Sequence, residues 1–127
     1  MKPTVAKREV KLLAPESEID FDFLQGMANR MSVSYYKYGA AAEGYPHRVS
    51  ALASLEERVN AYVETLNKEY LIDVANFAML EFMHPSLKGA HFAPTDSDGS
   101  PGRVDNLGQV THSGNSAIRK ASSQRQR

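Results

Sequence analysis

The segment from residue 68 to residue 83 constrains the fold more than any other part of this chain. It reads Lys-Glu-Tyr-Leu-Ile-Asp-Val-Ala-Asn-Phe-Ala-Met-Leu-Glu-Phe-Met, in which most side chains are apolar. Glu69, Asp73 and Asn76 follow one another at spacings of four and three residues, so on a helix they form one narrow polar stripe. A helix that is apolar on its other sides belongs inside a bundle. The segment therefore predicts a helix that packs against other helices.

The polar stripe on this helix is the clearest functional signal in the sequence. Carboxylates are rarely carried inside a protein unless they are paired or bind a metal. A stripe that faces the neighbouring helices therefore predicts a site for a cation or a polar ligand. A stripe that is simply the one solvated face of the helix predicts no site. The sequence alone leaves both readings open.

Composition limits the ligands that such a site can bind. The 127 residues include no cysteine, so a metal would be bound by oxygen or imidazole, which favours Mg²⁺ or Mn²⁺. The net charge is zero, yet residues 16–81 carry eleven acidic and five basic side chains, a balance of −6. An acidic centre disfavours a surface for specific nucleic-acid binding, which needs grouped Lys and Arg. It suits a site loaded with a cation.

Two other segments have helical periodicity. Apolar side chains recur every three or four residues over 21–37, with Asp20 as the candidate N-cap and Gly39 as a typical stop. The same pattern predicts a second helix over 49–66, and a possible capping box that starts at Ser54 indicates that it is split there. Leu66, the last residue of this pattern, and Asn67 form the whole connection to the helix described above, which predicts a tight antiparallel hairpin.

These segments predict an all-α fold, a small bundle of three main helices with a fourth short one if the second is split. Residues 1–18 are expected to form an N-terminal arm, residues 19–85 the helical core, and residues 86–127 a loop and a flexible basic tail. So small a bundle leaves apolar surface uncovered, so a homodimer is expected. The sequence lacks a long apolar run and an apparent signal peptide, which predicts a cytoplasmic protein that does not enter a membrane.

Aromatic and basic residues near the predicted site point to a nucleotide. Tyr36, Lys37 and Tyr38 close the first helix with stacking surfaces and a cation that attracts phosphate. Arg58, expected opposite Asp73, would either pair with the stripe or contact a phosphate. The ordinary alternative places Tyr35 and Tyr38 in the core and leaves Tyr36 and the basic side chains in solvent.

A loop is predicted over residues 40–47, which contain glycine and proline. Glu43, Tyr45 and His47 of this loop are expected to approach a bound molecule, since loops often carry binding residues. The loop therefore extends the predicted site beyond the helices.

The string Lys68-Glu-Tyr-Leu-Ile-Asp-Val-Ala-Asn-Phe77 resembles the third helix of MazG-like, all-α nucleoside triphosphate pyrophosphohydrolases. The string Tyr-Lys-Tyr-Gly39, followed by a helix that carries Arg58, is similar to a divergent branch of that superfamily, and small phage proteins carry comparable strings. The resemblance covers about residues 21–83. It implies a bundle of about four helices, often dimeric, which binds Mg²⁺ through carboxylates and hydrolyses a nucleoside triphosphate to the monophosphate and pyrophosphate.

Carried onto this chain, the resemblance makes Glu69 and Asp73 metal ligands and Asn76 a polar contact beside them. Glu57 would orient the attacking water. The chain departs from the family because the usual Glu-x-x-Glu pair is replaced by Glu57-x-x-Asn60, and fewer carboxylates weaken metal affinity. Two hypotheses follow: a nucleotide-directed protein, with or without turnover, and a small helical interaction protein without catalysis.

Overall fold

A computed structural model describes residues 6–95 of this chain, and all its regular elements are helical, as the sequence predicts. Beyond residue 95, the predicted basic tail lies outside the described residues. The described part holds three long α-helices, one short α-helix and one 3-10 turn, and none of its helices is long and apolar enough to cross a membrane. In chain order they are η1 (Glu16–Glu18), α1 (Phe21–Tyr38), α2 (Ala41–Gly44), α3 (Ala51–Thr65) and α4 (Glu69–Met83).

The ends of α1 follow from local chemistry. Asp20 Oδ1 accepts a hydrogen bond of 2.8 Å from the backbone N–H of Phe23, which satisfies one free donor of the first turn. Gly39 ends the helix with a φ of 91°, a conformation that glycine adopts without a steric penalty. Both end signals read from the sequence are therefore present, and α1 ends one residue later than predicted.

The predicted split of the second helix near Ser54 is wrong. Ser50 is the N-cap of α3, and its Oγ accepts a hydrogen bond of 3.1 Å from the N–H of Ala53. The Ser54 hydroxyl instead donates to the carbonyl of Ser50 at 2.7 Å, so it lies inside the first turn and caps nothing. The short extra helix is α2, which forms within the segment 40–47 that was predicted as a loop.

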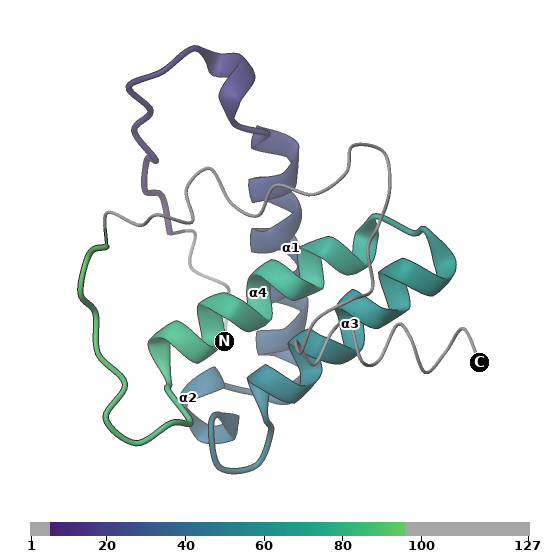
Figure 1. Ribbon diagram of the computed structural model, residues 1–127, viewed down its shortest axis with the longest axis vertical. Helices are drawn as coiled ribbons and strands as arrows, with labels where there is room; N and C mark the ends of the chain where they lie inside the picture. Colours follow the sequence, from purple (N-terminus) through teal and green to yellow (C-terminus); the bar gives the residue numbers. More distant parts are fainter. Residues whose placement is uncertain (1–5, 96–127) are drawn as a thin grey trace.

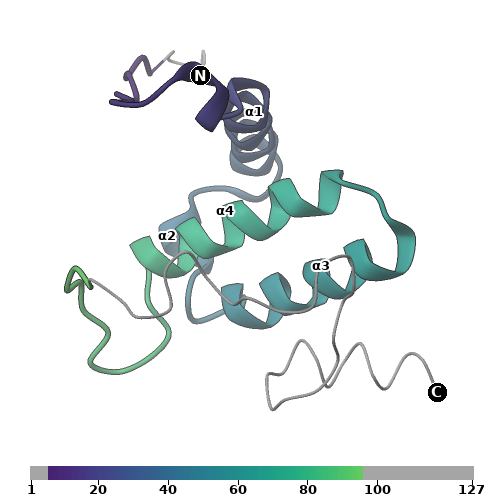
Figure 2. The same ribbon diagram turned by 45° about the horizontal axis from the view of Figure 1, so that its top comes forward.

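The long helices form two layers. The helices α3 and α4 pack as an antiparallel hairpin, and α1 crosses this hairpin in a separate layer against α4 (Figures 1 and 2). Leu66 permits the tight connection because it takes the left-handed conformation, with a φ of 62°. The short α2 lies at the end of the molecule where α1 passes into α3 (Figure 1).

The crossing of α1 and α4 is close at Gly26. A Cβ atom on Gly26 would lie 2.7 Å from Cδ1 of Ile72, too near for a van der Waals contact. Alanine at this position would therefore gain helix propensity, worth about 1 kcal/mol, and lose part of it by displacing the Ile72 methyl group. The glycine thus lets the two helices approach each other.

This close approach predicts coupling between Gly26→Ala and Ile72→Val. Ile72→Val alone should cost about 1 kcal/mol because it removes a packed methyl group. In the Gly26→Ala background the cost should shrink by at least about 0.5 kcal/mol, since the new Cβ occupies the vacated space. Urea unfolding of the wild type, both single variants and the double variant measures the coupling. Simple additivity would contradict the contact.

The core is small for a chain of this length. Among the described residues only Ala51, Asn76 and Leu80 are buried, and α1 contributes none of them. No large side chain in this part of the chain is completely enclosed. The stability of the single chain therefore depends on few contacts, and much apolar surface of α1 remains open.

Candidate functional site

The polar stripe of α4 faces its neighbours for part of its length. The Asp73 side chain is 13% exposed, whereas that of Glu69, at the start of the helix, is 58% exposed. Asn76 is buried, and its Nδ2 donates a hydrogen bond of 3.1 Å to the carbonyl of Met27 in α1. Its Oδ1 has no hydrogen-bond partner among the described residues. The stripe thus enters the bundle at Asp73 and Asn76.

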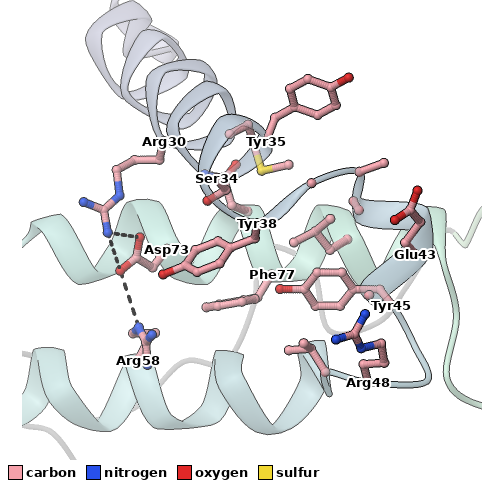
Figure 3. A pocket seen from close by; sticks show the side chains of 18 residues that line it. Arg30, Ser34, Tyr35, Tyr38, Glu43, Tyr45, Arg48, Arg58, Asp73 and Phe77 are labelled. Carbon is pink, nitrogen blue, oxygen red and sulfur yellow. Dashed lines mark hydrogen bonds and ion pairs between the residues drawn. The ribbon is translucent and has the colours of Figure 1, made fainter.

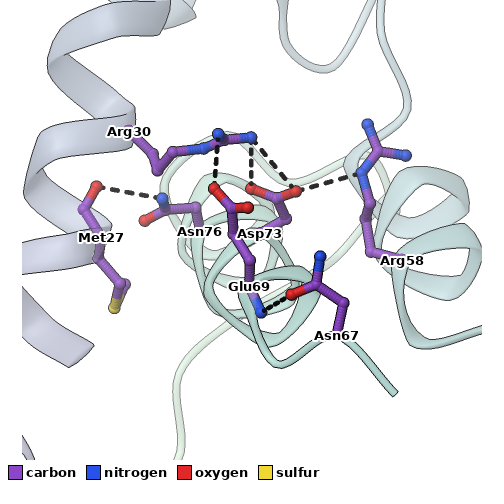
Figure 4. Close-up of polar contacts among 7 residues, drawn as sticks. All are labelled: Met27, Arg30, Arg58, Asn67, Glu69, Asp73 and Asn76. Carbon is purple, nitrogen blue, oxygen red and sulfur yellow. Dashed lines mark hydrogen bonds and ion pairs between the residues drawn. The ribbon is translucent and has the colours of Figure 1, made fainter. Parts of the chain in front are cut away.

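Asp73 is held by two arginines from different helices. Arg30 of α1 places Nη2 3.2 Å from Oδ1 of Asp73, and Arg58 of α3 places Nε 3.4 Å from Oδ2 (Figure 4). Arg30 also contacts Glu69, with Nη1 3.1 Å from Oε1. One partly buried carboxylate therefore links the three long helices and contacts two guanidinium groups.

Beside these ion pairs lies a cavity of about 650 Å³. Arg30 and Arg58 lie at one end of the cavity. Next to them, the rings of Tyr38, Phe77 and Tyr45 lie between Asp73 and the side chains of the α2 region (Figure 3). The guanidinium carbon of Arg58 lies 5.5 Å from the centre of the Phe77 ring, an arrangement that helps to fix this arginine. The charged residues that line the cavity are Arg30, Glu43, Arg48, Arg58 and Asp73.

The phenol of Tyr45 is half-buried in this wall. Burial raises the pKa of Tyr45 above its usual value of 10.0, and the positive charge of Arg58 offsets part of this rise. A folded-state pKa above the unfolded one means that the native state binds the proton more tightly. The resulting stability is complete below pH 10 and is lost as the pH rises through the unfolded and then the folded pKa.

Tyr45→Phe should therefore flatten the alkaline part of the stability curve. Between about pH 9 and pH 11 the wild type should lose more unfolding free energy than the variant, because only the wild type has this phenol to ionise. Denaturant titrations at several pH values measure the difference. Tyr36→Phe is a matched control, since Tyr36 is exposed and lies outside the cavity lining. Equal alkaline slopes in Tyr45→Phe and the wild type would contradict the argument.

The structure brings some of the candidate site residues together and leaves others apart. Tyr38, Arg58, Asp73 and Asn76 line the cavity, as do Glu43 and Tyr45 of the predicted loop. The remaining candidates are absent from this lining: Tyr36, Lys37, His47, Glu57 and Glu69. Exposed Lys37 instead lies over the ring of Tyr38, with Nζ 5.2 Å from its centre.

The sequence analysis missed Arg30 as a site residue. It is the only charged residue between Asp22 and Lys37 in α1, and this isolated charge could have marked it as a candidate. Its partners, Glu69 and Asp73, are about forty residues away in the chain, so no local spacing revealed the pairing. Arg48 and Phe77 were missed for the same reason.

The donor groups at this site do not match a magnesium cage. Within residues 6–95, no group of three or more Asp, Glu or His side chains is placed to bind a metal ion. Both predicted ligands, Glu69 and Asp73, are already paired with arginine. Guanidinium groups beside a cavity attract anions and repel a divalent cation. The arrangement therefore fits a phosphate group better than Mg²⁺.

Comparisons with known proteins identified no family for this chain. A scan against protein-family models found no match, and searches of curated proteins and of solved structures found none either. The resemblance to MazG-like pyrophosphohydrolases stays a hypothesis based on the residues that carry it.

Proposed function

We propose that this protein binds a nucleotide in the cavity between α1, the α2 region and α4. The observation that carries the proposal is the position of Asp73, shared by two arginines at the end of an aromatic cavity. The phosphate would lie at Arg30 and Arg58, and the base would lie among Tyr38, Tyr45 and Phe77.

The arginine end suits a phosphate for a geometric reason. Arg30 contacts both oxygens of Asp73, at 3.2 and 3.5 Å, and Arg58 contacts Oδ2 at 3.4 Å, so a planar anion already lies between the two guanidinium groups. A phosphoryl group presents two or three oxygens with similar spacing, and arginine binds such groups through paired hydrogen bonds. Asp73 and Glu69 balance the charges of the two arginines, so an incoming phosphate would compete with these carboxylates for the guanidinium groups.

The aromatic part of the cavity suits a base. A volume of about 650 Å³ falls within the range of roughly 300 to 1,000 Å³ that small-molecule sites occupy. Rings of tyrosine and phenylalanine offer flat faces on which a base can stack. Asn76 Oδ1, buried at the cavity wall without a partner, supplies an unused acceptor for a donor that reaches it.

Binding and hydrolysis make opposite predictions for Asp73→Asn. If Asp73 binds Mg²⁺ for pyrophosphohydrolysis, this variant loses its response to nucleotide. If Asp73 is only the counter-ion of Arg30 and Arg58, removing its charge frees Arg58 and leaves Arg30 paired with Glu69 alone, and nucleotide affinity should rise several-fold. Glu57 is exposed and lies outside the cavity lining, so Glu57→Gln should change neither result.

The deciding experiment is calorimetric titration of the full chain with the common nucleoside triphosphates, in EDTA and in Mg²⁺. We expect binding in EDTA, tighter binding by Asp73→Asn, and wild-type binding by Glu57→Gln. Pyrophosphate release in Mg²⁺, measured in parallel, separates turnover from binding alone. If no nucleotide binds the wild type under either condition, the proposal is wrong. If Asp73→Asn abolishes a Mg²⁺-dependent signal, the metal hypothesis replaces it.

An interaction protein without catalysis is the second candidate, and one observation favours it. Several large apolar side chains on α1 are exposed, among them Val33, Tyr35 and Tyr36, as is typical of a helix that packs against a partner. An interaction protein would gain thermal stability from that partner and none from nucleotides, so a melting series with and without nucleotide separates the two candidates.

A further inference from the structure

One face of α1 carries an apolar stripe that the described part of the chain leaves partly open. Phe21, Tyr35 and Tyr38 are 48%, 51% and 75% exposed, respectively. The stripe runs along one side of the helix, next to the face that contacts α4, because its members recur every three or four residues. The stripe consists of six residues: Phe21, Leu24, Ala28, Met31, Tyr35 and Tyr38.

The spacings between the stripe residues are the same in both directions along α1. They are three, four, three, four and three residues, so a second α1 in the opposite direction places Phe21 beside position 38, Leu24 beside position 35 and Ala28 beside position 31. Small Ala28 next to the midpoint lets the two helix axes approach. We infer that α1 pairs antiparallel with α1 of a second copy of this chain, around a two-fold axis that passes through the stripe between Ala28 and Met31.

A cavity on this side of the molecule can accommodate side chains of the partner subunit. This second cavity, of about 660 Å³, lies along the first half of the stripe, where Phe21, Leu24 and Ala28 face Val10 of the arm and Met79 of α4. In the antiparallel pair, Tyr35 and Tyr38 of the partner subunit reach this region. Aromatic side chains entering an apolar hollow are the usual anchors of protein interfaces.

The area available approaches that of a specific dimer. From their exposed fractions, the three aromatic side chains offer roughly 350 Å² per copy, given the size of such side chains. Two copies with Leu24, Ala28 and Met31 approach the total of about 1,000 Å² that a specific interface requires. Covering this area would also supply the core that the single chain lacks.

The pairing also bears on the nucleotide cavity, although it does not rest on the proposed function. Met31, Tyr35 and Tyr38 line that cavity as well, so the partner's α1 would add a wall at its open side. Nucleotide binding and self-association should then depend on each other. The experiments below use no nucleotide, so their outcome is separate from that of the binding test.

The first experiment is sedimentation equilibrium of the full chain over micromolar to millimolar concentrations. We expect a dimer, and we expect Ala28→Arg to raise its dissociation constant about a hundredfold, because the variant buries an unpaired charge at the interface. Asn29→Arg adds the same charge to the same turn on the side of α1 away from the stripe, so it should remain dimeric. Circular dichroism confirms that both variants are helical. A wild-type monomer throughout, or equal effects of both variants, would overturn the inference.

The second experiment tests the direction of pairing. The chain has no cysteine, so a Leu24→Cys/Tyr35→Cys variant can form only disulfides that were designed. Within one straight helix these positions are about 16 Å apart, too far to bridge, whereas in the antiparallel dimer each faces the other across the interface. We expect cross-linked dimers from the double variant, and from a mixture of the two single variants, on a non-reducing gel. Cross-linking of either single variant alone would indicate parallel pairing and overturn the proposed geometry.

Discussion

Leu80→Ala should destabilise the protein by about 3 kcal/mol, the typical cost of removing a buried leucine side chain and leaving a cavity. Leu80 is one of only two buried apolar residues in the described part of the chain, and it lies in the last turns of α4. A small domain has roughly 5 kcal/mol in total, so the loss should leave a measurable unfolded population at room temperature. Urea unfolding followed by far-ultraviolet circular dichroism measures it.

The control for this prediction is Leu52→Ala. Leu52 is a leucine in the neighbouring helix α3, but its side chain is exposed, so its truncation should cost less than about 1 kcal/mol. Similar losses from the two variants would mean that Leu80 is not the centre of the core. A small loss from Leu80→Ala would point to a second copy or another partner that supplies the missing contacts.

Arg58→Gln should lower nucleotide affinity between about tenfold and a hundredfold, because a hydrogen bond between charged groups contributes about 1.5 to 3 kcal/mol. Arg58 is the arginine that joins the two parts of the cavity, since it contacts Asp73 through Nε and lies over the ring of Phe77. Arg58→Lys should bind the nucleotide only slightly more tightly than Arg58→Gln, because lysine lacks the planar guanidinium group that binds a phosphate through paired hydrogen bonds. Calorimetric titration in EDTA measures the affinities.

Lys68→Gln is the matched control for the loss of one positive charge. Lys68 is exposed at the start of α4 and lies outside the cavity lining. It acts on a bound anion only at long range, so its loss should change affinity little at physiological salt. If Arg58→Gln and Lys68→Gln weaken binding equally, the phosphate is attracted by overall charge and does not contact Arg58. That result would contradict the proposed position of the phosphate.

Helix ends were predictable where a single residue decides them. Asp20 and Gly39 bound α1 because capping is a contact within one helical turn, and a turn of sequence contains all of it. The predicted split at Ser54 was wrong because serine caps a helix only at the N-cap position, and Ser50, four residues earlier, occupies that position. Two serines one helical turn apart have equal capping propensity, so they cannot be ranked without knowing where the helix begins.

The sequence by itself determined the all-α class, the three long helices and the polar stripe on α4, because periodicity and caps act within a few residues. Only the tertiary structure decided what the stripe contacts. Arg30 reaches Glu69 and Asp73 across about forty residues of chain, and such pairing depends on the angle at which α1 crosses α4. The two helices approach closely at Gly26 and Ile72, a contact between distant residues that no local pattern encodes. Tertiary packing thus places the carboxylate of Asp73 between two arginines, and the metal site stays a prediction from the sequence.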